Sequence, residues 1–395
     1  MKIVAKTFYG LEEVLSNELK ALGAKSIKVG NRVVEFDGDK EMMYKANLWL
    51  RTAISVLIPV KNFTFKDERD FKKQLSHINF GEYMHLNKTF AVKGAVNSKL
   101  FTYSKYPMLL LKDAIVDFFN DRYGQRPSVD AKSPKILFDL HIAENRCTIS
   151  MNSSGAPLFQ RGYRKGTGDA PLNEAMAAGL IMLAGWDQKS NLIDPVCGSG
   201  TIPIEAALMV NGIPANIARK QYSFMFWPDF DRQLWENILN AAPNTPKRDL
   251  GFSIIGSDTD GDVILKARNN IKALPLGKTV SFEIKDFKDV DPPKGGGMLI
   301  CNPPYGVRLD DDGVWDLYKE LGDFFKKKMQ GYTCWVISPN MEAFKRLELK
   351  PSSKIHIFNG PLSCDFRKYE VFEGSMVEHK YGEDTNQRRK TRQRK

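Results

Sequence analysis

The alternation of apolar and polar positions divides the chain into three blocks. Residues 11–22 carry leucine and valine at helical spacing and end at a glycine, which predicts an amphipathic helix. Two short strands are predicted around the turn pair Gly30-Asn31, and this α+β unit is expected to extend to about residue 60. The second block holds three predicted elements: a helix over 109–123 and strands over 135–142 and 146–151.

From residue 172 onward, helical and strand-like patterns alternate. The predicted elements are, in chain order, an alanine-rich helix ending at Gly185, a strand over 191–193, a helix over 202–210, a strand over 252–255, a helix over 262–273 and a strand over 298–301. Such alternation predicts an α/β fold with a parallel sheet. In sheets of this kind, ligands bind at the carboxyl ends of the strands.

Composition limits the class of protein. The chain has 395 residues, of which 42% are apolar, so a folded protein of two or three domains is expected. The sequence has no uncharged apolar run of about 18 residues, which argues against a signal peptide or a membrane span. We therefore expect a cytoplasmic protein. The five cysteines lie far apart without a C-x-x-C pair, so we expect neither a metal site nor a disulfide framework.

The net charge of +11 is unevenly distributed. It is +7 over residues 1–160, −2 over 161–387 and +6 over 388–395. The basic N-terminal region and tail would both attract a polyanion, and nucleic acid is the natural candidate. A solubilising, disordered end is the alternative for the tail.

Residues 194–201, D-P-V-C-G-S-G-T, lie between a predicted strand and a predicted helix. Gly198 and Gly200 allow the backbone to approach a ligand, and the N–H groups that open the helix can receive a polar group. The segment lacks the lysine of a phosphate loop, and Pro203 stands where a dinucleotide fingerprint has its third glycine. A tight turn without function is the alternative.

The next two groups of candidate residues are acidic. Asp258 comes directly after the strand that ends at Ile255, and its carboxylate could accept hydrogen bonds from ribose hydroxyls. A helix N-cap is the alternative, which we prefer for Asp260. Asp286 could bind an adenine amino group or be an ordinary surface carboxylate.

The fourth group, N-P-P-Y-G, follows the predicted strand over 298–301, and its two prolines force the chain to turn. An exocyclic amine on a base is a poor nucleophile because its lone pair is delocalised into the ring. The Asn302 side-chain oxygen and the Pro303 carbonyl could accept the two amine hydrogens and stabilise the positive charge that develops on methylation. Tyr305 would stack on a base removed from its helix. A strand-ending turn with a buried tyrosine is the alternative.

Together, D-P-V-C-G-S-G-T and N-P-P-Y-G resemble the class I S-adenosylmethionine-dependent methyltransferases that act on amino groups. Further segments resemble the THUMP-containing RNA guanine-N2 methyltransferases of the bacterial RlmL type. These segments are 111–117, 124–130, 160–164, 170–174 and 226–231 with Trp235. The resemblance covers nearly the whole chain.

The resemblance implies a Rossmann-like, seven-stranded methyltransferase domain preceded by α+β ferredoxin-like and THUMP domains. The expected boundaries are 1–60 for the ferredoxin-like domain, 61–160 for the THUMP domain, 161–387 for the methyltransferase domain and 388–395 for the basic tail. S-adenosylmethionine would be the cofactor. The residues implied for it are Asp194, Cys197, Gly198, Gly200 and Thr201 in the first loop, Asp258 at the ribose, Asp286 and Phe287 at the adenine, and Asn302. Those implied for the target base are Asn302, Pro303 and Tyr305.

The resemblance further implies RNA as the partner. The candidate RNA-binding residues are Lys112, Arg126, Arg161, Arg164, Arg388 and Arg389. We expect a monomer that methylates guanine N2 in 23S rRNA. Some family members carry a second, fused methyltransferase domain where this chain has its tail, so only the N2 activity is expected.

The acceptor motif alone would serve adenine-N6 and glutamine-N5 methylation equally well, because all three nucleophiles are planar amino groups. A tRNA guanine-N2 methyltransferase, an RNA adenine-N6 methyltransferase and a non-catalytic RNA-binding assembly factor therefore stay open as alternatives.

Overall fold

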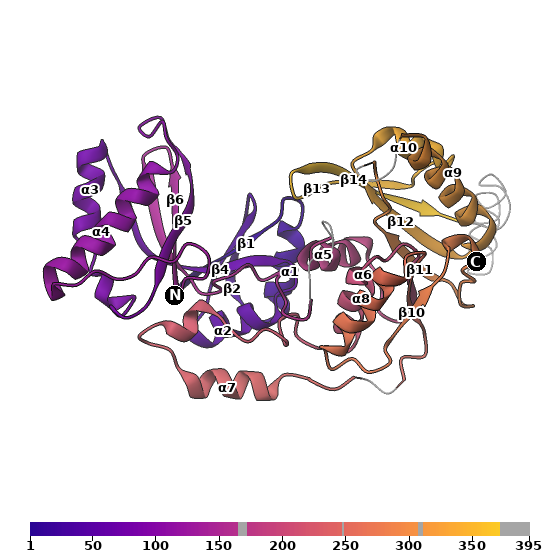
Figure 1. Cartoon of the computed structure of the whole chain (residues 1–395), viewed down its shortest axis with the longest axis horizontal. Coiled ribbons are helices and arrows are strands. Elements are labelled where there is room, and N and C mark those ends of the chain that lie inside the picture. The colour runs from indigo at the N-terminus through magenta and orange to yellow at the C-terminus, as the bar shows by residue number, and fades with distance from the viewer. Residues whose placement is uncertain (165–171, 247–248, 307–310, 372–395) are drawn as a thin grey trace, which may run out of the picture. The chain divides into compact units, whose positions relative to one another are not determined.

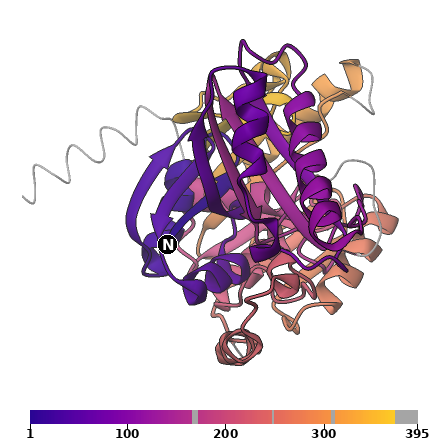
Figure 2. The ribbon, with the colours of Figure 1, turned by 90° about the vertical axis from the view of Figure 1, so that its left-hand side faces the viewer.

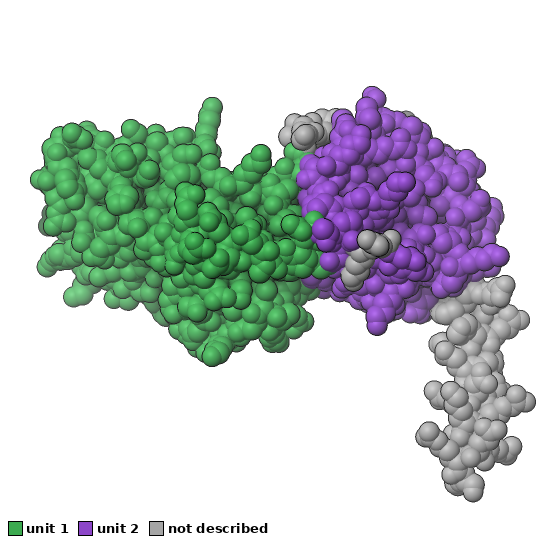
Figure 3. All heavy atoms as spheres, turned by 90° about the horizontal axis from the view of Figure 1, so that it is seen from below, with its two compact units in different colours: residues 1–164, 212–244 green, residues 165–211, 245–395 purple. Residues whose placement is uncertain are grey.

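The computed structural model describes residues 1–164, 172–246, 249–306 and 311–371. The chain divides into two compact units (Figure 3). Unit 1 comprises residues 1–164 and 212–244, and unit 2 comprises residues 165–211 and 245–395. Each unit is built on its own seven-stranded sheet.

In unit 1 the strands lie in the order β2-β3-β1-β4-β7-β6-β5 (Figure 1). The strands are β1 (Lys2–Thr7), β2 (Lys25–Gly30), β3 (Val33–Asp37), β4 (Ala53–Thr64), β5 (Phe90–Asn97), β6 (Ile136–Ala143) and β7 (Arg146–Asn152). The helices are α1 (Glu12–Ala21), α2 (Lys40–Trp49), α3 (Glu68–Ser76), α4 (Tyr106–Tyr123) and α7 (Arg232–Ala241). Neighbouring strands are antiparallel except β5 and β6, which are parallel.

Helix α4 shows how the sequence pattern forms an element. Its apolar residues make a stripe that packs with α3 against one face of the sheet (Figure 2). The helix begins at Tyr106, earlier than predicted, because Pro107 fits the first turn, where no N–H is needed. It ends at Gly124, whose φ of 68° gives the left-handed conformation of a helix C-cap.

Strand β4 joins the two halves of the unit 1 sheet. It pairs with β1 on one side and with β7 on the other. Because β4 runs from Ala53 to Thr64, the boundary expected at residue 60 falls inside a strand. The expected ferredoxin-like and THUMP domains therefore share one sheet, although each has its own hydrophobic cluster.

Segment 212–244 belongs to unit 1, although the expected methyltransferase domain, 161–387, includes it. Its aromatic side chains complete the core around α2. The ring centroid of Tyr44 lies 4.5 Å from that of Phe224 and 5.9 Å from that of Trp235. The expected third domain is thus interrupted by a segment that packs against the N-terminal sheet.

In unit 2 the strands lie in the order β10-β9-β8-β11-β12-β14-β13. The strands are β8 (Asn191–Asp194), β9 (Ile254–Asp258), β10 (Val280–Ile284), β11 (Gly297–Cys301), β12 (Tyr332–Ser338), β13 (Ser353–Asn359) and β14 (Leu362–Glu370). The helices are α5 (Glu174–Ala184), α6 (Thr201–Val210), α8 (Gly261–Lys272), α9 (Asp311–Lys328) and α10 (Met341–Arg346).

The sheet of unit 2 is parallel from β10 to β12, and β14 runs antiparallel to both of its neighbours. The predicted α/β class and the Rossmann-like seven-stranded sheet are therefore confirmed. Strand β8 lies between β9 and β11, so the strand order reverses there. Ligands of doubly wound sheets bind outside the carboxyl ends of the strands at this switch point. Within the described ranges, no helix is long and apolar enough to cross a membrane.

Candidate active site

Four side chains that were predicted from sequence stand at one edge of the unit 2 sheet. Asp194 is the last residue of β8 and Asp258 the last of β9. Asp286 follows β10, and Asn302 directly follows β11. Because these strands are parallel and adjacent, their carboxyl ends line the same edge.

The Asp258 carboxylate holds the glycine-rich loop in place. One of its oxygens accepts a hydrogen bond from the Gly198 N–H at 2.9 Å, and the other accepts one from the Asp260 N–H at 3.1 Å. The Cys197 N–H donates to the Ser257 carbonyl at 2.8 Å, which links the loop to β9 a second time. Asp260 caps α8, as predicted, by accepting from the Asp262 N–H.

The two loop glycines serve different purposes. Gly198 has a φ of 52°, and a Cβ there would meet no atom within 4 Å, so this backbone borders open space. Gly200 has a φ of 80° and opens α6, but a Cβ there would lie 2.6 Å from the ring of Phe282. Gly198 is thus the glycine that leaves room for a ligand, whereas Gly200 lets the loop pack on β10. Thr201, the first residue of α6, is buried.

Asp194 is a buried carboxyl group with little to stabilise its charge. It is 2% exposed and accepts a hydrogen bond from the Val196 N–H at 3.3 Å. Burial raises its pKa well above the usual range, and the charge of Asp258 raises this pKa further. A ligand that carries positive charge would compensate this carboxylate. S-adenosylmethionine, with an ammonium and a sulfonium group, has the chemistry that this site lacks.

Asp286 and Phe287, the residues expected to contact the adenine, have side chains that already make other contacts. The Asp286 carboxylate caps a short 3-10 turn by accepting from the Lys288 N–H at 2.9 Å. The Phe287 side chain is 5% exposed and packs on Phe324, with ring centroids 5.7 Å apart. Its ring belongs to the core, so only the backbone of Phe287 is left for a cofactor.

The side-chain oxygen of Asn302 is buried in an unusual way. Its Oδ1 is buried, and no hydrogen-bond partner for it lies among the described residues. Buried polar atoms are nearly always hydrogen-bonded, so an acceptor left open in this way needs an explanation. Pro303, whose carbonyl is the second predicted acceptor, is buried next to it.

Tyr305 is half-buried and lies near the hairpin of β13 and β14. Burial raises the pKa of its phenol and the Cys364 thiol raises it further, whereas a side-chain hydrogen bond with Asn359 lowers it. Asn359 ends β13 and Cys364 lies in β14. Sequence reasoning missed both residues, because nothing in the local pattern links this hairpin to residue 305.

The predicted RNA-binding residues have different environments. Arg126 is exposed, whereas Lys112 forms an ion pair with Asp113 at 2.9 Å and Arg164 is partly buried. Arg388 and Arg389 lie outside the described residues, so the role of the tail stays a prediction.

Arg161 requires a correction. It is 1% exposed, and its guanidinium donates to the backbone carbonyls of Leu50, Arg51 and Leu158. It therefore joins the connection between α2 and β4 to the segment that follows β7 rather than presenting its charge to RNA. The predicted role of Arg161 as an RNA contact was therefore wrong.

A doubly wound sheet with a glycine-rich turn after β8, an acid at the end of β9 and N-P-P-Y after β11 defines a class I methyltransferase that uses S-adenosylmethionine. In the ranges that the structure describes, no group of three or more histidine, cysteine or acidic residues could hold a metal ion.

Three family models match the chain. They are the RlmL ferredoxin-like domain over residues 2–57, the THUMP domain over 65–152, and the RMKL-like methyltransferase domain over 161–368. The chain belongs to this RMKL-like methyltransferase family.

Relatives extend over the whole chain. The protein named "Putative RNA methyltransferase slr0064", from Synechocystis, is 36% identical over 92% of this chain and 95% of its own length. The "Ribosomal RNA large subunit methyltransferase K/L" of Aeromonas hydrophila is 33% identical over 94% of this chain but 54% of its own length. The chain thus spans about half the length of the K/L methyltransferases that it matches.

Solved structures share the fold at somewhat lower identity. One is "SMU.472, a putative methyltransferase complexed with SAH", with a TM-score of 0.82, 29% identity, and coverage of 95% of this chain and 99% of the other. Another is described as "a predicted N6-adenine-specific DNA methylase" from Listeria monocytogenes, with a TM-score of 0.83, 29% identity, and coverage of 94% and 96%.

Proposed function

We propose that this protein transfers a methyl group from S-adenosylmethionine to the exocyclic N2 amine of a guanine in 23S rRNA. The THUMP match and the names of the K/L relatives support an RNA substrate of the large ribosomal subunit. The observation that carries the chemical part of the proposal is the buried Asn302 Oδ1 at the switch point of the sheet, an acceptor for which the described residues provide no donor.

Asn302 and Pro303 act on the amine. Their two oxygens accept the two N–H groups of the guanine amine, which draws its lone pair out of the ring and toward the incoming methyl group. The same oxygens stabilise the positive charge that develops on nitrogen. They do so strongly because the Asn302 oxygen is buried away from water. No strong base is needed, since the alkylated nitrogen becomes acidic and its proton can leave to solvent.

The other predicted residues hold the cofactor, which when bound supplies an electrophilic methyl group. Asp194 places a buried negative charge beside its cationic part, and Gly198 provides backbone with open space in front of it. Asp258 already accepts two N–H groups. A carboxylate has further lone pairs, so Asp258 can still accept from ribose hydroxyls.

Adenine-N6 methylation is the second candidate, because the solved relative from Listeria monocytogenes carries that description and the Asn302 acceptor fits either amine. A tRNA guanine, the first alternative from the sequence, is the other candidate. The acceptor geometry is the same in all three cases, so the substrate has to be identified by experiment.

The test incubates the purified full-length protein with methyl-labelled S-adenosylmethionine and, in parallel, with deproteinised 23S rRNA and bulk tRNA that lack the modification. The RNA is digested and its nucleosides are separated. We expect label in N2-methylguanosine from 23S rRNA only. Label in tRNA would overturn the substrate, and label in N6-methyladenosine would overturn the target base. An Asn302→Ala sample run beside the wild type controls for a contaminating methyltransferase.

A further inference from the structure

Unit 1 contains a pocket of about 380 Å³ that the predicted site does not use. Its walls come from β5, from the turn that precedes β6, from the segment after β7, and from residues 218–223. Three lysines line it, Lys93, Lys132 and Lys220, and none of the described residues that line it is acidic. A volume of this size can receive a nucleotide or a similar small group.

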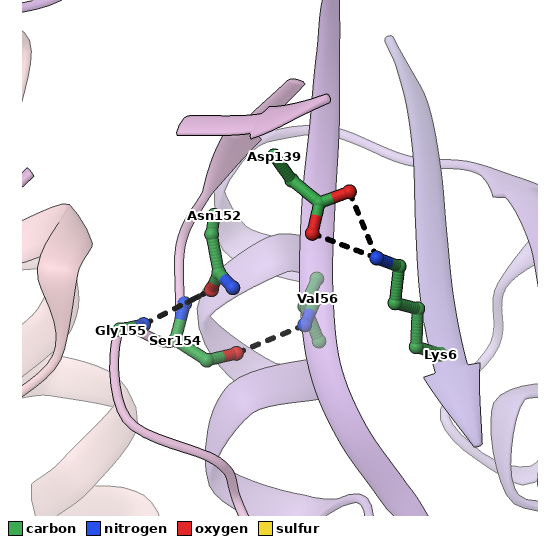
Figure 4. Close-up of polar contacts among 6 residues, drawn as sticks. All are labelled: Lys6, Val56, Asp139, Asn152, Ser154 and Gly155. Atoms are coloured by element: carbon green, nitrogen blue, oxygen red, sulfur yellow. Dashed lines mark hydrogen bonds and ion pairs between the residues drawn. The ribbon is translucent and has the colours of Figure 1, made fainter. Parts of the chain in front are cut away.

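The walls of this pocket are fixed by hydrogen bonds (Figure 4). Asn152 Oδ1 accepts from the N–H groups of Ser154 and Gly155, both at 3.0 Å. Ser154 Oγ in turn accepts from the Val56 N–H at 2.9 Å, which anchors the turn to β4. On the opposite wall, Ser223 Oγ donates to the carbonyl of Lys135 at 2.7 Å. The pocket is therefore formed before any ligand binds.

Arg219 connects the two walls and brings a partly buried positive charge. Its guanidinium donates to the carbonyls of Ser154, Ala156 and Pro157 at 2.7–2.8 Å. The hydrogen bonds described for Arg219 all go to carbonyl oxygens and none to a carboxylate. Burial lowers the pKa of Arg219, and the charge of Arg161 lowers it further. The guanidinium also lies over the Tyr222 ring, 4.9 Å from its centroid, so Arg219 holds the pocket wall together and adds positive charge to it.

The three pocket lysines are exposed. In the described part of the chain, none of them forms an ion pair with a carboxylate. Lys93 and Leu137 lie on the face of the sheet opposite to the face that α3 and α4 cover, because side chains alternate along β5 and β6. The pocket therefore lies between this face of the sheet, where Leu137 is buried, and residues 218–223, and its three lysines line the same cavity.

The carboxylates near the pocket are held by other partners. Asp139 is the partner of Lys93 in the pairing of β5 and β6, but both of its oxygens bind the Lys6 ammonium, at 2.7 and 2.8 Å (Figure 4). Asp130 accepts hydrogen bonds from the backbone N–H groups of Lys132 and Ser133, both at 3.0 Å. The Asp130 charge also interacts electrostatically with Lys132, but it forms no described ion pair with it, so the pocket lysines can still bind an external anion.

We propose that this pocket of unit 1 binds a phosphate of the RNA backbone, held by Lys93, Lys132 and Lys220. The inference rests on the RNA substrate proposed above and adds a second, sequence-independent contact to it. Phosphate contacts of this kind position an RNA without reading its bases. The pocket lysines differ from the RNA-binding residues predicted from sequence, since they meet only when segment 212–244 packs on the sheet.

The test is equilibrium filter binding of the full-length protein to deproteinised 23S rRNA over a range of salt concentrations. The variant replaces Lys93, Lys132 and Lys220 by glutamine, and each lost phosphate contact should flatten the salt slope by about 0.7 to 0.9. The matched control replaces Lys20, Lys25 and Lys28, which are exposed on α1 and β2 toward the opposite edge of the sheet. Both triple variants remove the same charge from unit 1.

We expect a weaker affinity and a flatter slope for the pocket variant only, with an unchanged dissociation constant for S-adenosylmethionine. Equal effects of the two triple variants, or a slope for the pocket variant equal to that of the wild type, would overturn the pocket while leaving the proposed methylation intact. Tight binding of inorganic phosphate that the pocket variant loses, with unchanged RNA binding, would overturn RNA as the ligand. A wild-type protein that does not bind RNA would overturn the proposed function as well.

Discussion

Replacing Asn302 by alanine tests the central element of the proposed chemistry. The Asn302 Oδ1 is a buried acceptor without a described partner, so the substitution breaks no hydrogen bond of that oxygen in the cofactor-free protein. The free energy of unfolding should therefore change by no more than about 1 kcal/mol. Catalysis depends on the oxygen much more strongly, because its partner is the amine whose positive charge grows in the transition state.

The expected loss of rate follows from the number of acceptors. Removing one preorganised hydrogen-bonding group from a site of this kind costs about 10²–10³ in kcat, or about 2.7–4 kcal/mol. The Pro303 carbonyl remains in the variant, so a residual rate above the uncatalysed reaction is expected. Asn302→Asp keeps an acceptor oxygen in a side chain of similar volume and should lose less activity than Asn302→Ala.

Single-turnover methylation with excess enzyme gives the rate of the chemical step, and calorimetry gives the affinity for S-adenosylmethionine. We expect the single-turnover rate of Asn302→Ala to be lower by a factor of about 10²–10³, with nearly unchanged cofactor affinity and melting temperature. A variant with the wild-type single-turnover rate would refute the role of Asn302. So would a loss of rate that is fully explained by weaker cofactor binding or by a loss of folded protein.

Three further substitutions probe the end of β8 and the glycine-rich loop that follows it. Asp194→Asn removes a buried carboxyl with a raised pKa, so the cofactor-free variant should melt at a higher temperature than the wild type at about pH 8, yet bind S-adenosylmethionine more weakly. In the wild type, cofactor affinity by calorimetry should fall as the pH is lowered through that raised pKa, because protonation removes the compensating charge; an affinity independent of pH would contradict this. Gly200→Ala should destabilise the protein by roughly 1–3 kcal/mol, because its Cβ would lie 2.6 Å from the Phe282 ring at a φ of 80°. Gly198→Ala should melt closer to the wild type and lose mainly cofactor affinity, so equal melting temperatures of the two variants would argue against the division of roles.

The sequence predicted the elements that depend on local periodicity and the residues that stand at strand ends. The strand ends of β8, β9 and β11 could be located from short apolar runs that stop at Asp194, near Asp258 and at Asn302. This worked because a parallel strand and the loop after it are neighbours in the chain, so one motif contains both. The Asp260 N-cap was predictable for the same reason, since the cap and its helix are adjacent.

Features that depend on contacts between distant segments could not be predicted in this way. Segment 212–244 packs with unit 1 because Trp235 and Phe224 meet Tyr44, a partner far away in the sequence. Arg161 looked like an RNA contact, because its charge is visible in the sequence while the carbonyls that surround it are not. Strand β4 likewise shows no break at residue 60, since its pairing with β1 and β7 is decided by the sheet as a whole.

Two buried polar groups of the site, the Asp194 carboxylate and the Asn302 side-chain oxygen, lie at the ends of adjacent strands. Asp194 ends β8, Asn302 follows β11, and these strands pair directly at the switch point of the sheet. Methyl transfer to an amine removes a positive charge from sulfur and creates one on nitrogen. The Asp194 carboxylate can therefore stabilise the positive charge of the cofactor before the transfer. The Asn302 oxygen, which has no donor among the described residues, can stabilise the positive charge that forms on the amine nitrogen. Within the cofactor-free protein both groups are unfavourable, because each is buried without adequate compensation. Their presence at this edge is explained by ligands that provide a positive charge for one and hydrogen-bond donors for the other.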